Sequence, residues 1–146
     1  MDFEMMKKLP SICEIGNKTY AINEYGLNAM FLIVGSEKAL LIDTGTGVCN
    51  LPAVVKFLTD KPLMVALTHG HPDHAGGNGF FEEIYCHPDD FEMSLNLTYE
   101  TRRGYADGLL KGNPTAPVTA EDTWNFDKQP KMLPLFVQFL LIRHLQ

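Results

Sequence analysis

Short apolar runs separated by turn residues dominate the first half of the chain. Segments 28–34 and 39–42 are almost wholly apolar, which is typical of strands buried on both faces of a sheet. Segments 11–15 and 19–23 flank Gly16-Asn17-Lys18, a short turn sequence that predicts a β-hairpin. These runs predict that the chain begins with a β-sheet.

Helical signals follow and alternate with further strands. Asn50 is a suitable cap for a helix over residues 51–59, because its side-chain oxygen can accept a hydrogen bond from the first helical turn. After it the pattern predicts strands over 63–67 and 80–86, helices over 88–97 and 99–110, and a proline-containing loop over 112–130. Alternating strands and helices predict an α/β fold.

Candidate chemistry is concentrated directly after the predicted strand over 63–67. His69, His71, Asp73 and His74 fall within six residues. Imidazole nitrogens and a carboxylate oxygen are the ligands that zinc takes in catalytic sites. The end of a buried strand is also where open α/β sheets place their ligand sites. The loop is therefore a candidate metal centre.

The spacing of the four residues suggests which of them would bind the same metal ion. His69 and His71 stand two apart on an extended segment, so their rings point to the same side and can hold one ion. Asp73 and His74 follow Pro72, where we expect the chain to turn into a helix and to aim these side chains elsewhere. Ligands that differ in direction suit a second metal close to the first.

Two motifs resemble a known family. The sequence Leu67-Thr68-His69-Gly70-His71-Pro72-Asp73-His74-Ala75-Gly76-Gly77 is similar to the H-x-H-x-D-H motif of the metallo-β-lactamase superfamily. Leu41-Ile42-Asp43-Thr44-Gly45 resembles that family's aspartate in a D-T-G turn near the metals, and it lies about 25 residues earlier. The resemblance covers about residues 11–100.

The resemblance implies a role for each motif residue. His69 and His71 would bind the first Zn²⁺ and Asp73 and His74 the second, so that one or two ions are expected. Asp43 would hold the loop by hydrogen bonds and so fix the orientation of the ligands. The di-iron, oxygen-reducing branch usually has glutamate where this chain has His71, so the histidine favours zinc and hydrolysis over an iron-dependent oxidoreductase.

The implied activity is hydrolysis of a small-molecule substrate. A metal-activated hydroxide would attack an ester, thioester, lactone, amide or phosphoester, and Asp73 would help to orient it. His87 precedes Pro88-Asp89, where capping or surface use is expected rather than metal binding. His144 lies in a Leu-rich run that lacks the glycine-rich setting of the family's later histidines.

The chain also departs from the family pattern. Family members continue well beyond 146 residues and add a third histidine in a P-G-H-T-like turn, a bridging aspartate and a final histidine, none of which is matched here. Their fold is an αββα sandwich of two similar halves. We therefore expect an α/β, metallo-β-lactamase-like fold truncated to roughly its first half, with a partial domain over 11–128 and an atypical apolar C-terminal tail over 129–146.

A half-sandwich has two physical consequences. The metals would be short of ligands, which leaves open an alternative: a truncated, non-catalytic remnant that binds metal weakly or self-associates. The inner face of the sheet would lack its partner sheet, which predicts a homodimer that covers it.

The composition of the chain argues against nucleic-acid and membrane partners. Hydrophobic residues make up 45% and charged residues 21%, as in ordinary globular domains. The net charge of -6 argues against nucleic acid bound through a basic patch. Segment 133–145 is shorter than the roughly 20 residues of a spanning helix and contains Pro134, Gln138 and Arg143, so no membrane partner is expected.

The cysteines and the N-terminus suggest a compartment. Cys13, Cys49 and Cys86 are odd in number and none has a C-x-x-C spacing, so we expect buried, inert thiols rather than metal ligands. The first residues are acidic and no apolar run follows Lys7 and Lys8, which is unlike a secretory signal. Both features predict a cytoplasmic protein.

Overall fold

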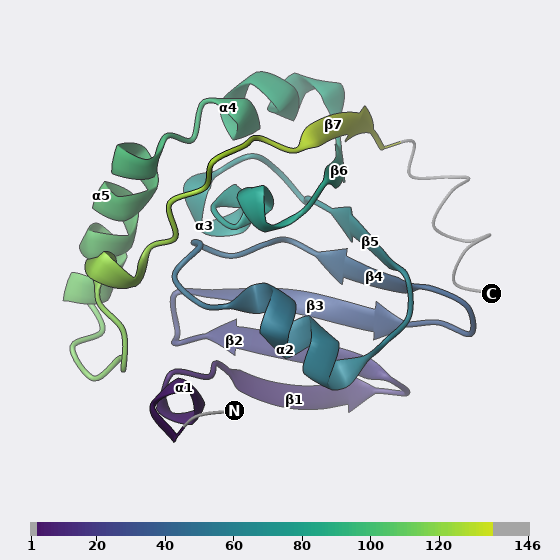
Figure 1. Cartoon of the computed structure of the whole chain (residues 1–146), viewed down its shortest axis with the longest axis horizontal. Coiled ribbons are helices and arrows are strands. Elements are labelled where there is room, and N and C mark those ends of the chain that lie inside the picture. Colours follow the sequence, from purple (N-terminus) through teal and green to yellow (C-terminus); the bar gives the residue numbers. More distant parts are fainter. Residues whose placement is uncertain (1–2, 136–146) are drawn as a thin grey trace.

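The computed structural model describes residues 3–135, and these form one seven-stranded sheet whose strands follow chain order (Figure 1). The first four strands are mutually antiparallel and the last four are mutually parallel. The strands are β1 (Ser11–Gly16), β2 (Thr19–Glu24), β3 (Asn28–Val34), β4 (Ala39–Ile42), β5 (Leu63–Ala66), β6 (Glu83–Cys86) and β7 (Lys131–Pro134). The α/β prediction and the hairpin over 11–23 are confirmed.

The helices lie between the parallel strands. They are α2 (Leu51–Leu58), α3 (Pro72–Ala75), α4 (Phe91–Leu95) and α5 (Tyr99–Lys111), with α1 (Phe3–Lys7) before the sheet and 3₁₀ turns at Asn78–Phe80, Pro88–Asp90 and Ala120–Asp122. Asn50 caps α2 as predicted, since its Oδ1 accepts from the backbone N–H of Ala53 at 3.3 Å. Helix α2 joins β4 to β5, and its length lets those two strands run parallel.

The core lies between α2 and one face of the sheet. Ile22, Leu32 and Leu41 contribute from neighbouring strands and are fully buried against Leu51 and Val54 of α2. Burial of apolar area on this scale is the main stabilising contribution to such a domain. It also holds the C-terminal ends of β4 and β5 in one place, which matters for the site described below.

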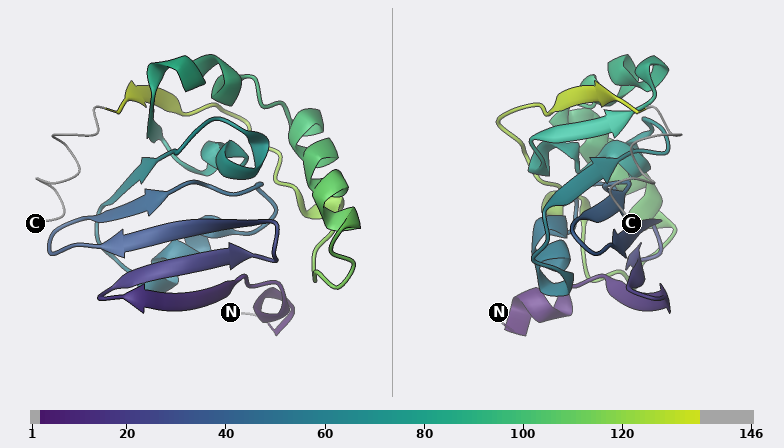
Figure 2. Two further views of the ribbon diagram at one scale, coloured as in Figure 1. Left: turned by 180° about the vertical axis from the view of Figure 1, so that it is seen from behind. Right: turned by 90° about the vertical axis from the view of Figure 1, so that its right-hand side faces the viewer.

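The opposite face carries an apolar row that crosses all seven strands. Strand register places side by side Cys13, Ala21, Phe31, Ile42, Ala66, Tyr85 and Leu133. Among the described residues, no helix lies over this face of β1–β4 (Figure 2). The prediction that segment 28–34 is buried on both faces is therefore wrong: Met30 and Leu32 are buried, whereas Phe31 and Ile33 remain partly exposed.

Two boundaries differ from the sequence prediction. The strand expected over 80–86 begins only at Glu83, because the chain first makes a 3₁₀ turn over Asn78–Phe80. Phe80 then packs edge-on against Phe126, with ring centroids 4.7 Å apart, a contact with a segment far along the chain. Residues 131–134, assigned to the tail from sequence, form β7 beside β6, and residues 136–146 lie outside the described part.

The cysteines are free thiols, as expected, but they are not all buried. Burial raises the pKa of Cys49 and of Cys86, which keeps both thiols protonated and unreactive. Cys13 is exposed, contrary to prediction, because β1 is an edge strand. Within residues 3–135, no helix is long and apolar enough to cross a membrane.

Candidate metal centre

The histidine loop and the Asp43 turn meet at one edge of the sheet. Asp43 directly follows β4 and Thr68 follows β5 by one residue, and these neighbouring strands are parallel, so their ends lie together. The backbone N–H of Asp43 donates to the carbonyl of Ala66 at 2.8 Å, which extends the sheet pairing to the beginning of the loop. Sheet topology therefore brings together two motifs that are about 25 residues apart in sequence.

Asp43 is a buried acceptor for the loop. Its Oδ1 accepts from the backbone N–H of Thr68 at 2.8 Å, and its Oδ2 accepts from Nδ1 of His74 at 2.8 Å. The hydroxyl of Thr68 lies 2.9 Å from Oδ2 and 3.0 Å from Oδ1. Asp43 has φ +66°, a left-handed conformation that aspartate tolerates better than most residues. This backbone turn directs the carboxylate into the loop.

These hydrogen bonds determine which histidine nitrogens are free. A carboxylate has no hydrogen, so Thr68 must donate its hydroxyl proton to Asp43. The Thr68 oxygen can then only accept from Nδ1 of His69, 2.9 Å away. His69 and His74 are thereby both held as the Nδ1–H tautomer, which leaves the Nε2 lone pair of each ring available to a metal.

Each of these two Nε2 atoms lies close to a second ligand atom, which gives two ligand pairs. Nε2 of His69 lies 3.1 Å from Nδ1 of His71, and Nε2 of His74 lies 3.4 Å from Oδ2 of Asp73. Two ligands on one tetrahedral zinc, each at its usual bond length, are about 3.3 Å apart. Each pair therefore has the spacing of two ligands to one ion.

The pairs are closer together than the sequence suggested. Asp73 and His74 were expected to aim elsewhere, but the ring of His74 lies beside that of His69, with centroids 4.1 Å apart. The reason is α3, which starts after His71 and turns the chain back at once: the backbone N–H of His74 donates to the carbonyl of His71 at 3.0 Å. All three rings thus form one cluster.

The ligand number is incomplete within the described residues. Among residues 3–135, no three His, Cys, Asp or Glu side chains are arranged to hold a single ion. His87 caps the turn at Pro88–Asp90, where its Nδ1 accepts from the N–H of Asp89 at 3.2 Å, as predicted. His144 lies outside the described residues. The donor chemistry fits zinc, and each pair requires further ligands.

Two glycines let the loop approach the Asp43 turn. A Cβ added to Gly77 would lie 2.3 Å from the carbonyl oxygen of Thr44, and one added to Gly76 would lie 2.3 Å from that of Thr46. Side chains do not fit at such distances. The close approach also allows the N–H of Thr44 to donate to the carbonyl of His74 at 2.8 Å.

Three contacts were not foreseen from the sequence. Asp90 accepts from the backbone N–H of Gly70 at 3.1 Å, between the two histidines of the first pair. Asn28 donates to the carbonyl of Asp73 at 2.6 Å, and the Tyr105 hydroxyl lies 3.4 Å from Oδ1 of Asp73. Partial burial and the Asp73 carboxylate raise the pKa of Tyr105. Only Asp90 had a local signal, as part of a helix start.

Comparison with known proteins identifies the family. The family model for the metallo-beta-lactamase superfamily matches residues 25–129, which is most of the chain. The chain belongs to this superfamily, a family of hydrolases that generally bind metal ions. The crystal structure of DIM-1 metallo-beta-lactamase has a similar fold, with a TM-score of 0.51 and 13% identity over 87% of this chain and 52% of that one.

Two curated relatives carry a more specific name. Acyl-coenzyme A thioesterase MBLAC2 of Homo sapiens is 29% identical over 99 residues, which cover 59% of this chain and 36% of the relative. The same protein of Gallus gallus is 34% identical over 67 residues, covering 40% of this chain and 24% of the relative. The chain thus spans about a quarter to a third of these relatives.

Proposed function

We propose that this chain is a zinc-dependent hydrolase in which His69 and His71 hold one ion and Asp73 and His74 a second. The observation that carries the proposal is the 3.1 Å separation of Nε2 of His69 from Nδ1 of His71, together with the Thr68 hydrogen bond that selects the Nδ1–H tautomer of the neutral His69 ring. Catalytic zinc takes three protein ligands, so further ligands would have to come from outside the described residues.

The residues around the pairs would orient and maintain the ligands. Zinc, when bound, would supply a polarised carbonyl and an activated water for hydrolysis. Asp43 would hold His74 directly and His69 through Thr68. Asp73, tethered by Asn28 and Tyr105, would orient the attacking water as well as bind metal. These roles need the fixed ring orientations that the Asp43 hydrogen bonds provide.

Thioesters are the substrate class that we propose first among the ester, thioester, lactone, amide and phosphoester candidates. Both curated relatives are named acyl-coenzyme A thioesterases, and the matches cover 24% and 36% of their length. Substrate choice in folds of this kind depends on loops around the site. A screen of acyl thioesters against oxygen esters and lactones tests this choice.

The second candidate is a chain that binds metal weakly and has no catalytic activity. It is favoured by the absence, within residues 3–135, of any three ligands arranged around one ion. Two ligands and water hold zinc much less tightly than three or four protein ligands do. The two candidates therefore predict different metal contents.

Metal content per chain separates them. The purified 146-residue protein, its His71→Ala variant and a His87→Ala control would be compared by elemental mass spectrometry. One or two zinc equivalents in the wild type and the control, with loss in His71→Ala, would support the hydrolase. Little zinc in all three would favour the non-catalytic candidate, and equal zinc in all three would place the metal elsewhere.

We also propose that a second copy covers the apolar row of the sheet. Phe31, Ile42 and Tyr85 lie in register on that face and are partly exposed. Sedimentation velocity would compare Phe31→Ser with Phe57→Ser, since Phe57 is an exposed phenylalanine on α2, away from the row. We expect dissociation in Phe31→Ser alone; a monomeric wild type would contradict the homodimer.

A cytoplasmic location is the last part of the proposal. The described cysteines are all free, which suits a reducing compartment. Fluorescence microscopy of the tagged chain in its source cells would test it, and a signal confined to a secretory compartment would contradict it.

A further inference from the structure

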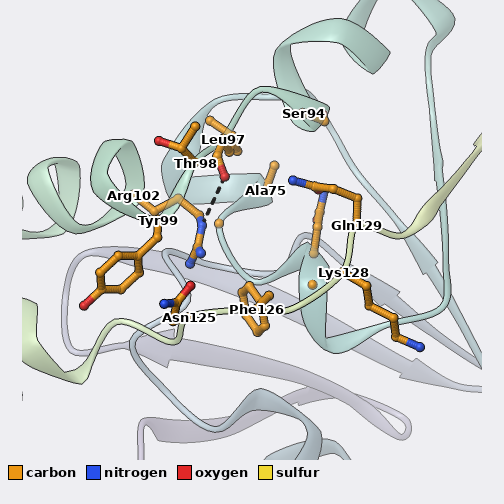
Figure 3. Close-up of a pocket in the computed structure, with 13 residues that line it drawn as sticks. Ala75, Ser94, Leu97, Thr98, Tyr99, Arg102, Asn125, Phe126, Lys128 and Gln129 are labelled. Carbon is orange, nitrogen blue, oxygen red and sulfur yellow. Dashed lines mark hydrogen bonds between the residues drawn. The ribbon is translucent and has the colours of Figure 1, made fainter.

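A polar cavity lies next to the histidine loop and is separate from the proposed metal ligands. It has a volume of about 210 Å³ and is formed by the segment after α3, by the ends of α4 and α5 that face each other, and by the segment leading to β7 (Figure 3). None of the four proposed metal ligands lines it. The residues that carry the argument below are Asn78, Ser94, Thr98, Tyr99 and Arg102.

Arg102 supplies a buried positive charge. Its side chain is only 5% exposed, its Nε donates to the carbonyl of Leu97 at 3.3 Å, and its Nη1 donates to the carbonyl of Trp124 at 2.8 Å. The guanidinium also lies over the ring of Phe126, 4.7 Å from the centroid. Among residues 3–135 no salt bridge joins it to a carboxylate, although the charge of Glu100 acts on it from a distance. A buried charge without a directly paired counter-charge is costly.

Two further residues that line the cavity carry a donor with no partner within the described structure. Asn78 is 4% exposed; its Oδ1 accepts from the hydroxyl of Thr44 at 2.8 Å, but its Nδ2 has no hydrogen-bond partner. Ser94 is 3% exposed and its hydroxyl is likewise unpartnered. Buried polar groups are almost always hydrogen-bonded, so these two need an explanation.

The rest of the cavity lining also contributes a positive electrostatic potential. Thr98 and Tyr99 stand at the N-terminal end of the 13-residue helix α5, where unpaired N–H groups and the helix dipole favour an anion. The described residues that line the cavity include Arg102 and Lys128 but no Asp or Glu. Lys128 pairs with Glu82 at 2.6 Å, so of these two cations only Arg102 lacks a salt bridge within residues 3–135.

We propose that this cavity binds a phosphate-type oxyanion. Arg102 and the α5 terminus would supply the positive potential, and Nδ2 of Asn78 and Oγ of Ser94 would donate hydrogen bonds to the oxygens. The site adjoins the metal loop, because a Cβ on Gly70 would lie 2.8 Å from Oγ of Ser94, and Asn78 binds Thr44 of the Asp43 turn. The anion site does not depend on the proposed zinc chemistry.

Phosphorus NMR titration of the metal-stripped full chain with inorganic phosphate tests the site. Ser94→Ala removes one donor, and Asn78→Asp keeps the oxygen that accepts from Thr44 while it replaces the other donor by a charged oxygen. Each charge-assisted hydrogen bond is worth enough that we expect binding about tenfold weaker or lost in each variant. Glycerol phosphate in place of phosphate would show whether a phosphomonoester is preferred to the free ion.

Two controls locate the effect. Thr123→Val removes another buried, unpartnered hydroxyl that does not line the cavity, and it should leave phosphate binding unchanged. His71→Ala should also bind phosphate normally, which excludes anion capture by residual metal. No saturable binding, or binding unaltered in both Ser94→Ala and Asn78→Asp, would overturn the proposal and leave water as the partner of these groups. Circular dichroism would verify that the variants fold.

Discussion

Nδ1 of His74 donates a hydrogen bond of 2.8 Å to Oδ2 of Asp43, so that a residue at the end of β4 fixes a ring on α3. The same carboxylate accepts from the backbone and hydroxyl of Thr68, and through that hydroxyl it also determines the tautomer of His69. One buried side chain therefore orients one member of each proposed ligand pair.

Replacement of Asp43 by alanine should reduce zinc affinity by roughly ten- to a hundredfold, because partners that orient metal-binding histidines have effects of that size. The affinity would be measured by competition with a chromogenic chelator. Asp60→Ala is the control, since Asp60 is an exposed residue paired only with Lys56. Wild-type zinc affinity in a folded Asp43→Ala variant would show that Asp43 does not orient the ligands.

Asp90 should hold the backbone of the histidine loop in place at Gly70. Its Oδ1 accepts from the N–H of Gly70, so Asp90→Ala is expected to release the backbone between His69 and His71. Hydrogen exchange at the Gly70 amide should speed up at least tenfold, because a hydrogen bond to a carboxylate contributes about 1.5 kcal/mol or more of protection. Asp89→Ala is a matched neighbour, exposed and paired with His87; an equal effect there would refute the role of Asp90.

Two glycine substitutions should act in opposite directions. Gly77→Ala would place a methyl group 2.3 Å from the carbonyl oxygen of Thr44 and should cost about 1–3 kcal/mol of stability. Gly104→Ala adds a methyl group to an open position of α5 and should stabilise by about 0.5–1 kcal/mol. Urea denaturation of both variants measures this; equal stability in the two would mean that Gly77 is not needed for close approach.

Glu24 should make the protein less stable as pH rises through neutrality. Burial raises the pKa of this fully buried carboxyl from 4.5 to about 7, although hydrogen bonds from Thr46 and Cys49 partly oppose the shift. The folded state therefore holds the proton more tightly than the unfolded state. The stability that this proton contributes is complete below pH 4.5 and is lost as the pH rises through about 7, by on the order of 3 kcal/mol.

Glu24→Gln mimics the neutral acid and should remove that dependence. Unfolding free energies from urea titrations between pH 5 and about 8 would be compared for wild type, Glu24→Gln and Glu83→Gln, an exposed control. We expect the wild type and the control to lose stability over this range and Glu24→Gln to stay level. A slope unchanged in Glu24→Gln would assign the pH dependence to another group.

Much of this fold could be predicted because its signals are local. The apolar run of β3, the turn at Gly16-Asn17-Lys18 and the Asn50 cap depend on neighbouring residues, and each was found where expected. The histidine motif was equally readable, since its ligand types lie within six residues. The prediction failed where long-range packing intervened, as when Phe126 met Phe80 and the expected strand began at Glu83 instead.

The sequence by itself determined the α/β class, the family and the residue types of the candidate metal centre, because periodicity, turn residues and motif spacing act over a few positions. The family resemblance implied that Asp43 holds the loop, but only the tertiary structure decided that its partners are Thr68 and His74. It also decided that Asp90 holds Gly70, and that Arg102, which has no salt bridge within residues 3–135, lines the same cavity as Asn78 and Ser94. The partners in these contacts are up to 31 positions apart in the sequence, as Asp43 and His74 are. No local sequence pattern indicates which residue contacts which. The partners meet because parallel strands end at one edge of a sheet and because buried polar groups must find partners wherever the fold brings them.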